Sequence, residues 1–286
     1  MPSLVVCEGA MKKKKRPRKK GTYYDYDGER HASVRWDYVL FGVGVAAFLI
    51  CALLAFINDV QESKSRQTLQ GLKEMQEIVF ATGANGNATD GGNEVEVSYE
   101  KIFAKNEDMI GWLQIPGTEI DYPVMQTMED EEYYLKRDFY GNDDKNGCLL
   151  MDTDSDVTKT SNNLIIHGHN MRSGAMFGTL KDYEDEAYEK EHSKILFTTQ
   201  TETRTYEIVA VIHSKVYTAA DQVFKYYNFF EAKTQDEFDY FYDNMKEMSL
   251  YDTGVTATFG DEFITLSTCS YHTKNGRLAV IAKRVK

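Results

Sequence analysis

Cysteine is scarce in this sequence, with 4 residues among 286. They stand far apart, at Cys7, Cys51, Cys148 and Cys269. Cys51 lies inside a long apolar segment and Cys7 precedes it, so only two cysteines remain for the rest of the chain. At most one disulfide can form there, which excludes a fold held together by a network of disulfides.

Charge is missing altogether from Tyr38 to Ile57, which reads YVLFGVGVAAFLICALLAFI. At a rise of about 1.5 Å per residue such a helix spans about 30 Å, the thickness of a hydrocarbon core. A buried core helix would normally show a polar face, and none is visible here. A cleaved signal peptide fits less well, because the preceding region is too long and no small-residue cleavage site follows. Residues 37–57 are therefore expected to be a transmembrane signal anchor.

Positive charge is concentrated before this segment. Residues 1–36 carry ten Lys or Arg against four acids, with a dense basic run from Lys12 to Lys20, whereas Asp59 and Glu62 follow the apolar stretch. A basic run can also serve as a nucleic-acid or nuclear signal, but beside a membrane helix it favours a cytoplasmic position. We expect residues 1–36 to be a basic cytoplasmic tail. The protein would then cross the cell membrane once, with the residues after the membrane segment outside the cell.

The remainder of the chain has a large acidic excess. The formal net charge is −12, the tail contributes +6 and Asp37 contributes −1, so the residues after Ile57 carry −17. Such a domain repels phosphate backbones, so we expect no nucleic-acid partner.

Two regions follow the membrane segment. Residues 58–80 are polar with loosely helical apolar spacing, and residues 81–93 are rich in Gly and Asn with no apolar period. We expect residues 58–96 to be a stalk and flexible linker, and residues 97–286 to be the extracellular folded domain.

The long C-terminal part reads mainly as strands. Eight short runs are rich in Val, Ile, Leu or Tyr and bounded by Gly, Asn or Asp: Ile110–Ile115, Ile120–Val124, Cys148–Met151, Leu164–His167, Ile195–Thr199, Thr205–Val216, Phe263–Thr268 and Leu278–Ala282. Four helical pieces accompany them: Tyr99–Lys105, Glu129–Leu135, Met176–Glu191 and Thr234–Met248. Because strands and helices do not alternate, the pattern predicts a mainly β fold, a closed or nearly closed barrel with inserted helices.

The end of the chain places a thiol and a guanidinium on neighbouring strands. An apolar strand runs into Cys269, a polar loop with Asn275-Gly276 follows, and Arg277 opens the next apolar strand. Antiparallel pairing would bring Cys269 and Arg277 together. A structural cysteine and a solvated arginine explain the same residues, because buried cysteines are common.

Two histidines, His167 and His169, follow another apolar strand in SNNLIIHGHNMRSGAMFGTL. Alternate residues of a strand share a face, so this H-x-H pattern is compatible with metal binding. No other His has matching spacing, so we expect neither a metal nor another cofactor. An acid/base role requires one imidazole near the thiol.

These segments resemble the sortase family, which combines a Gly-His motif, a T-L-x-T-C strand end and an arginine on the following strand. The matching positions are Gly168-His169, TLSTC at Thr265–Cys269, and Arg277. Longer strings resemble the class B branch: GWLQIPGTEIDYPV at Gly111–Val124, YYLKRDFYG at Tyr133–Gly141 and HGHNMRSGAMFGTL at His167–Leu180. The helical insertion at Thr234–Met248 fits the same branch.

The resemblance implies an eight-stranded sortase-type β-barrel that acts as a cysteine transpeptidase. It would cleave a C-terminal sorting motif of secreted proteins through a thioester and join them to an amine of a peptidoglycan precursor or cross-bridge. By matching position, Cys269 would be the nucleophile, His169 the acid/base and Arg277 the oxyanion partner. Leu135, His167 and Ser267 would bind substrate.

Two positions depart from the class B pattern. His167 stands where Tyr is common, and Glu131 stands where Asn is common. Both changes fall in the expected substrate groove, so the recognised motif cannot be transferred. A disulfide between Cys148 and Cys269 would block the nucleophile, so we expect Cys148 to be a free, buried thiol.

Two other interpretations remain. Another exported Cys/His cell-wall peptidase is disfavoured, because such enzymes generally place Cys before His in the chain. A membrane-tethered binding module would leave Cys269 structural, and thiol labelling that depends on His169 would separate it from an enzyme.

Overall fold

The computed structural model describes residues 22–24, 30–32, 35–80, 95–158 and 162–285. The chain divides into two compact units, Met1–Asn58 and Asp59–Lys286. Most of the expected basic tail, including the Lys12–Lys20 run, lies outside the described residues, as does the Gly/Asn-rich segment 81–93.

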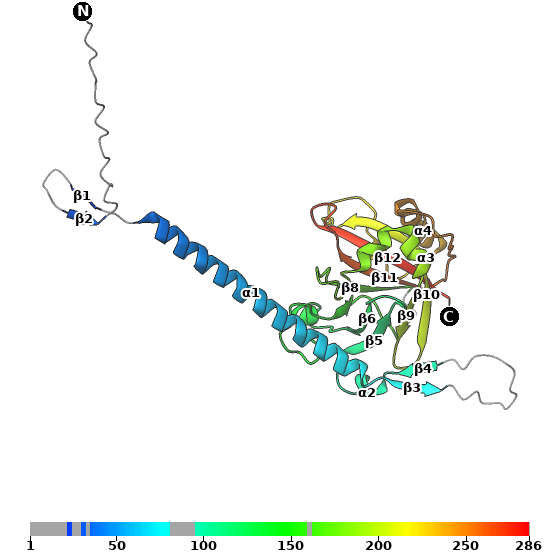
Figure 1. The fold of residues 1–286 in the computed structure, drawn as a ribbon. Helices are drawn as coiled ribbons and strands as arrows, with labels where there is room; N and C mark the ends of the chain where they lie inside the picture. Colours follow the sequence, from blue (N-terminus) through cyan, green and yellow to red (C-terminus); the bar gives the residue numbers. More distant parts are fainter. Residues whose placement is uncertain (1–21, 25–29, 33–34, 81–94, 159–161, 286) are drawn as a thin grey trace, which may run out of the picture. The chain divides into compact units, whose positions relative to one another are not determined.

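The first unit contains a hairpin and most of a long helix. Strands β1 (Thr22–Tyr24) and β2 (Arg30–Ala32) pair antiparallel. Helix α1 (Trp36–Lys73) contains the uncharged stretch and continues past it into the second unit (Figure 1). Its apolar stretch is long enough to cross a membrane, and none of it is buried. The uncharged part of this helix is therefore a candidate membrane span.

The second unit is built on a closed eight-stranded barrel. Around the barrel the strands follow the order β10-β12-β11-β8-β7-β6-β5-β9. The strands are β5 (Met109–Gln114), β6 (Asp121–Met125), β7 (Leu149–Met151), β8 (Asn163–Gly168), β9 (Lys194–Thr198), β10 (Thr203–Lys215), β11 (Phe263–Cys269) and β12 (Gly276–Arg284). The predicted mainly β fold is confirmed, and each predicted strand corresponds to one of these with its ends shifted by a few residues.

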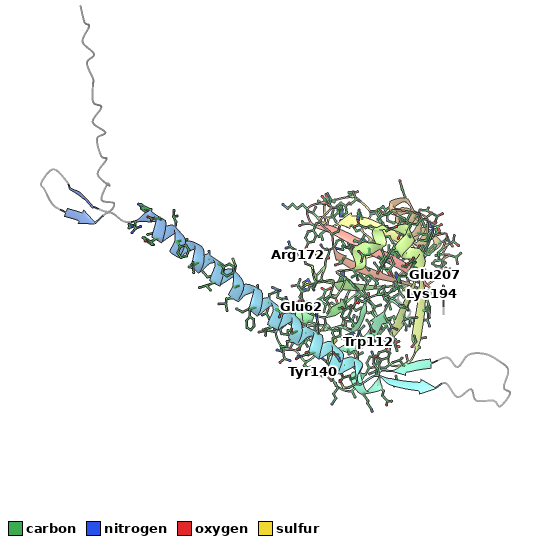
Figure 2. All side chains as sticks on the ribbon, in the orientation of Figure 1. Glu62, Trp112, Tyr140, Arg172, Lys194 and Glu207 are labelled. Carbon is green, nitrogen blue, oxygen red and sulfur yellow. The ribbon has the colours of Figure 1, made fainter. Side chains whose placement is uncertain are left out.

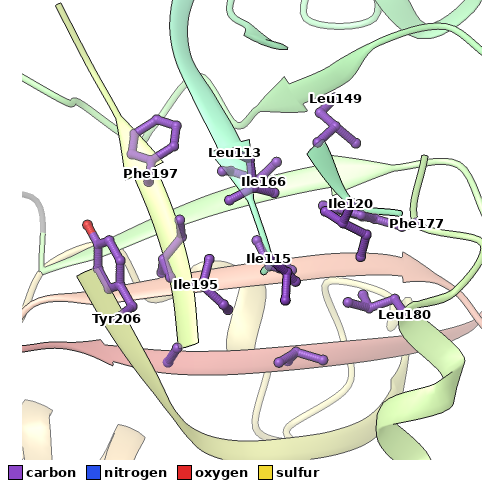
Figure 3. Close-up of a cluster of buried hydrophobic side chains, with 14 of the residues drawn as sticks. Leu113, Ile115, Ile120, Leu149, Ile166, Phe177, Leu180, Ile195, Phe197 and Tyr206 are labelled. Atoms are coloured by element: carbon purple, nitrogen blue, oxygen red, sulfur yellow. The ribbon is translucent and has the colours of Figure 1, made fainter. Parts of the chain in front are cut away.

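Alternation along the strands separates two hydrophobic layers. On β11, Ile264 and Leu266 belong to the cluster that fills the barrel, part of which Figure 3 shows. Phe263 belongs to a second cluster with Phe241 of α4 (Gln235–Met248). Both faces of β11 are thus covered, and the strand is buried along its length until Cys269 at its end. Burial on both faces fixes the register that sets the position of Cys269.

The helices differ from the sequence prediction in two places. The segment Met176–Glu191, expected to be one helix, contains a 3₁₀ helix, η2 (Leu180–Glu184), and a short helix, α3 (Glu186–Glu191). Between them Asp185 has an extended backbone, and its side chain accepts a hydrogen bond from the Ala187 amide as a helix cap. The strong capping preference of Asp therefore interrupts the helical pattern.

The segment Glu129–Leu135 was also expected to be helical. Only a 3₁₀ turn, η1 (Tyr133–Lys136), forms there. By contrast α4 begins one residue later than expected, because Thr234 caps it by accepting from the Glu237 amide. The remaining helical elements are α2 (Glu100–Phe103) and η3 (Tyr226–Asn228).

The last turns of α1 belong to the core of the second unit. Leu72 is 1% exposed and packs in one cluster with Trp112 of β5. Lys73 forms an ion pair with Asp121 at 2.7 Å. Glu62 of α1 is buried as well. Figure 2 labels both Glu62 and Trp112. Part of the segment expected to be a stalk is therefore helical and packed against the barrel.

A two-stranded sheet follows α1. Strands β3 (Glu77–Phe80) and β4 (Val95–Ser98) pair antiparallel, with Glu77 opposite Ser98. β4 leads into α2, whose Ile102 and Phe103 are buried in the same cluster as Leu72. The barrel is thus preceded by a packed helix and hairpin within the second unit.

Candidate active site

The candidate site lies where three strands meet. β11 runs parallel to β8, and their pairing ends at Thr268 opposite Gly168. Cys269 follows Thr268 at the end of β11, and His169 follows Gly168 at the end of β8. The two candidate catalytic groups therefore lie at adjacent strand ends. β12 runs antiparallel to β11 and places Arg277 directly opposite Cys269. The register thus gathers residues separated by about a hundred positions of sequence.

The thiol of Cys269 is exposed, free and held next to a cation. Arg277 Nη1 donates a hydrogen bond to Cys269 Sγ at 3.4 Å and to the Gly276 carbonyl at 3.2 Å. The backbone acceptor fixes the direction of the guanidinium. An arginine so placed presents further donors to any negative charge that develops beside the sulfur.

The connection between the two strands is a tight loop. Asn275 has a positive φ of 57°, which Asn tolerates better than most residues, and the Ser270 amide donates to the Gly276 carbonyl at 2.9 Å. A Cβ on Gly276 would lie 2.4 Å from the Ser270 carbonyl oxygen, so only glycine fits there. The Asn-Gly pair seen in the sequence therefore holds the turn that brings Arg277 back to Cys269.

Two hydrogen bonds fasten the ends of β8 and β11 to one another. The Thr268 hydroxyl donates to the Gly168 carbonyl at 2.7 Å, and the Asn170 amide Nδ2 donates to the Cys269 carbonyl at 2.8 Å. Each bond runs from one strand end to the backbone of the other. The backbones that carry the imidazole and the thiol are therefore held together on both sides.

His169 has a partner outside these strands. Its Nε2 lies 2.8 Å from the backbone carbonyl oxygen of Leu135, which belongs to η1. The His169 carbonyl accepts a hydrogen bond from the Phe177 amide at 3.0 Å. Both the ring and the backbone of His169 are thus held by segments next to β8.

The three expected substrate-binding residues have different surroundings. His167 is opposite Ser267 on β11, and its Nε2 lies 3.4 Å from Asp152 Oδ2. Leu135 is half-buried beside His169, which uses its carbonyl. All three therefore lie next to the candidate catalytic residues in the fold.

Ser267 is the most enclosed of them, at 1% exposure. Its hydroxyl is 2.7 Å from the hydroxyl of Tyr226, a buried residue of η3. Burial raises the pKa of Tyr226 to about 12, although the Ser267 hydrogen bond acts in the opposite direction. Tyr226 therefore remains a neutral phenol that covers the Ser267 side of the strand.

Cys148 and possible metal ligands are the other groups that could take part in chemistry. Cys148 is a free thiol, 6% exposed, and lies 3.4 Å from the Arg137 carbonyl, as expected for a buried cysteine. Burial, followed by the carboxylates of Asp138 and Asp144, raises its pKa well above the usual range. In the part of the chain that the structure describes, no three His, Cys, Asp or Glu side chains gather as metal ligands do.

Sequence reasoning did not find three contributors to the site. Asn170 follows His169 directly in the HGHN string, but nothing local indicates that its amide reaches Cys269. The Leu135 carbonyl and the Tyr226 hydroxyl come from turns far away in sequence. A backbone acceptor carries no sequence signal, so only the fold identifies it.

Known proteins of a single family are similar to this chain over most of its length. Residues 113–285 match the family model of the sortase domain. The chain is 30% identical to Sortase B of Listeria monocytogenes over 229 residues, covering 79% of this chain and 88% of that protein. It is 29% identical to Sortase B of Staphylococcus aureus over 252 residues, covering 87% of this chain and 95% of that protein.

A solved structure shares the architecture as well. The structure of sortase B from Bacillus anthracis in complex with AAEK1 has a TM-score of 0.63 and 30% identity, covering 79% of this chain and 99% of that chain. The chain therefore belongs to the sortase family, whose members are cysteine transpeptidases. Within that family its relatives are of the B type.

Proposed function

We propose that this chain is a membrane-anchored transpeptidase of the sortase B type, with Cys269 as nucleophile. The observation that carries the proposal is the hydrogen bond from Arg277 to the Cys269 thiol, at the strand end beside His169. Family membership supports the reaction class. The substrates are secreted proteins with a C-terminal sorting motif, and the acceptor is an amine of a peptidoglycan precursor or cross-bridge.

In the first half-reaction the Cys269 sulfur attacks the backbone carbonyl carbon of the threonine residue in the sorting motif. The thiol proton passes to His169, and Arg277 donates hydrogen bonds to the oxygen of the tetrahedral intermediate. The C–N bond then breaks while His169 returns a proton to the leaving amine. A thioester on Cys269 and a shortened leaving peptide remain.

In the second half-reaction the acceptor amine attacks the thioester carbon. His169 takes a proton from the incoming nitrogen, the C–S bond breaks, and Cys269 regains its proton. A new amide joins the secreted protein to the acceptor. An amine competes well with water for a thioester, so transfer dominates over hydrolysis when the acceptor is present.

The remaining roles follow from position. Leu135 and His167 lie beside the catalytic residues and are proposed to line the sorting-motif groove. Ser267, buried against Tyr226, is proposed to form the floor of that groove. The uncharged part of α1 is proposed to anchor the protein in the cell membrane, with the basic N-terminal tail in the cytoplasm and the barrel outside. Recognition of a secreted substrate and a wall amine requires this orientation.

The test uses the full chain in non-ionic detergent micelles with a library of internally quenched peptides and an amine acceptor. We expect cleavage of one motif class, an acyl adduct on Cys269 by mass spectrometry, and an amide product that depends on the acceptor. Cys269→Ala should abolish all three. Cleavage that survives in Cys269→Ala, or products formed only with water at high acceptor concentration, would contradict the proposal.

A further inference from the structure

The hydrogen bond between His169 and Leu135 constrains the imidazole's protonation. A backbone carbonyl oxygen can only accept, so the ring nitrogen 2.8 Å from it must carry a hydrogen. That nitrogen is Nε2. In the neutral ring the other nitrogen, Nδ1, is then unprotonated.

We infer that His169 exchanges all its catalytic protons through Nδ1, and that Gly147 is a positioning residue that sets the Leu135 carbonyl against Nε2. The inference rests on the proposed role of His169. Among the residues that the structure describes, the only hydrogen bond to the His169 ring is made by Nε2, which leaves Nδ1 as the ring nitrogen available to exchange protons.

The backbone of Gly147 lies directly against the Leu135 carbonyl and leaves no room for a side chain. It has a positive φ of 59°, and a Cβ there would lie 2.3 Å from the Leu135 carbonyl oxygen and 2.7 Å from that of Tyr134. Backbone atoms cannot yield as a flexible side chain can. Any larger residue at Gly147 must therefore displace the carbonyl that holds His169.

The loop around this contact is fastened at several points. The Cys148 amide donates to the Tyr134 carbonyl at 3.0 Å, and the Asp144 amide donates to the Lys136 carbonyl at 2.9 Å. These bonds fix η1 against the start of β7. The Leu135 carbonyl is thus presented by a rigid segment rather than a mobile loop, as an orienting group requires.

The proton steps then have a single route. During acylation the thiol proton moves from Cys269 to Nδ1, which gives an imidazolium whose Nε2–H still bonds Leu135. Nδ1–H passes its proton to the leaving amine, and the ring returns to the Nε2–H tautomer. During transfer Nδ1 takes one proton from the acceptor amine and gives it to the departing sulfur. Nε2 keeps its hydrogen throughout.

Nitrogen NMR tests the tautomer without reference to activity. The full chain is labelled with ¹⁵N-histidine in detergent micelles, and His169 is assigned by comparison with His169→Gln among the 6 histidines. At alkaline pH we expect a proton-bearing Nε2, an unprotonated Nδ1, and an Nε2–H signal protected from solvent exchange. An Nδ1–H tautomer in the wild-type protein would overturn the inference.

The variants test the role of Gly147. We expect Gly147→Ala to lose the protected Nε2–H signal and to lower kcat by about 10–100-fold with KM changed less than threefold, as displacement of a catalytic group predicts. Gly141→Ala is the matched control, because Gly141 also has a positive φ, 80°, but its Cβ would meet only the Tyr133 hydroxyl at 3.5 Å.

The control should keep both the signal and kcat. Survival of the protected Nε2–H signal in Gly147→Ala would overturn the positioning role. If Gly147→Ala fails to fold, the wild-type tautomer still decides the route of the protons. An active His169→Ala would instead contradict the proposed function, so the two failures are distinguishable.

Discussion

Arg277 lies directly opposite Cys269 on the β11–β12 ladder and donates a hydrogen bond to its sulfur at 3.4 Å. The same guanidinium nitrogen also donates to the Gly276 carbonyl. The cation is therefore oriented by the backbone and not only attracted by the thiol. This arrangement distinguishes a directed donor from a diffuse positive charge.

Replacement of Arg277 tests that distinction. Lys keeps the charge but lacks the planar fork of donors, so Arg277→Lys and Arg277→Ala should both lower kcat/KM by at least about tenfold. Loss of one oxyanion donor typically costs about 10²–10³ in rate. Steady-state kinetics measure the effect, and thermal unfolding should show little change in Tm. Near-full activity in Arg277→Lys would mean that charge alone suffices.

The two histidines should separate functionally. His169→Ala should abolish turnover, because His169 is the imidazole at the strand end beside Cys269 and is proposed to protonate the leaving amine. His167→Tyr should keep the fold and mainly change KM for the sorting peptide, since His167 lies beside the site and pairs with Asp152. The check is kcat and KM for each variant. Equal loss of kcat in His167→Ala and His169→Ala would reverse the assignment.

Cys148 should be dispensable for chemistry. Its thiol is buried and its pKa is raised, so it is a poor nucleophile near neutral pH. Cys148→Ala should retain most activity while losing about 1–2 kcal/mol of stability from the removed sulfur contacts. A thiol reagent on the native protein should label Cys269 and leave Cys148 unmodified. A Cys148–Cys269 disulfide in active enzyme, detected by non-reducing mass analysis, would contradict this.

The sequence was sufficient to predict the barrel because its strands are short apolar runs with clear boundaries. Phe263–Thr268 and Leu278–Ala282, for example, consist mainly of Phe, Val, Ile, Leu, Ala or Thr and are bounded by polar or Gly residues. The candidate site was also predictable in part, since Cys269 and Arg277 flank a turn signal. The strand register then brings them together with little dependence on other parts of the chain.

Long-range contacts account for what sequence reasoning missed. Leu69 and Leu72 have helical spacing, but the sequence does not say that Leu72 packs beside Trp112 rather than facing solvent. An Asp can occupy either a helix or a cap position, and only the structure shows that Asp185 has an extended backbone and caps α3. The carbonyl of Leu135 is chemically identical to every other carbonyl, so its contact with His169 follows from the fold alone.

We expect the folded domain to need the buried end of α1, where Leu72 packs with Trp112. A chain starting at residue 90 loses Leu72 and the Lys73–Asp121 ion pair, so we expect it to be poorly folded even though it contains all candidate catalytic residues. A chain starting at Asp59 should unfold like the full protein. Thermal unfolding of the two fragments measures this difference.

Point variants in the full chain provide the matched comparison. Leu72→Ala should cost about 2–5 kcal/mol, the usual range for a buried leucine, whereas Gln67→Ala on an exposed position of the same helix should be nearly neutral. Stable, active protein from residue 90 would show that α1 contributes nothing beyond membrane attachment.

The final prediction concerns Glu62, a buried carboxylate on α1. Burial alone would raise its pKa, but hydrogen bonds from Lys145, Ser173 and Asn146 outweigh it and lower the pKa from 4.5. Lys145 Nζ lies 3.1 Å from Glu62 Oε2. Because the folded pKa is below the unfolded one, the charged carboxylate stabilises the fold above about pH 4.5, and this stabilisation is lost as pH falls through the folded pKa.

Glu62→Gln should therefore lower Tm at pH 7, by an amount equivalent to roughly 1.5–3 kcal/mol, the usual contribution of a hydrogen bond to a charged group. The difference from wild type should shrink steadily as pH falls below about 4.5, because protonation removes the same charge from the wild-type protein. Thermal unfolding of the full chain in non-ionic micelles from pH 3 to 7 measures it, with Glu74→Gln, an exposed residue just beyond α1, as control. A Tm difference that is independent of pH would mean that Glu62 contributes through packing and not through its charge.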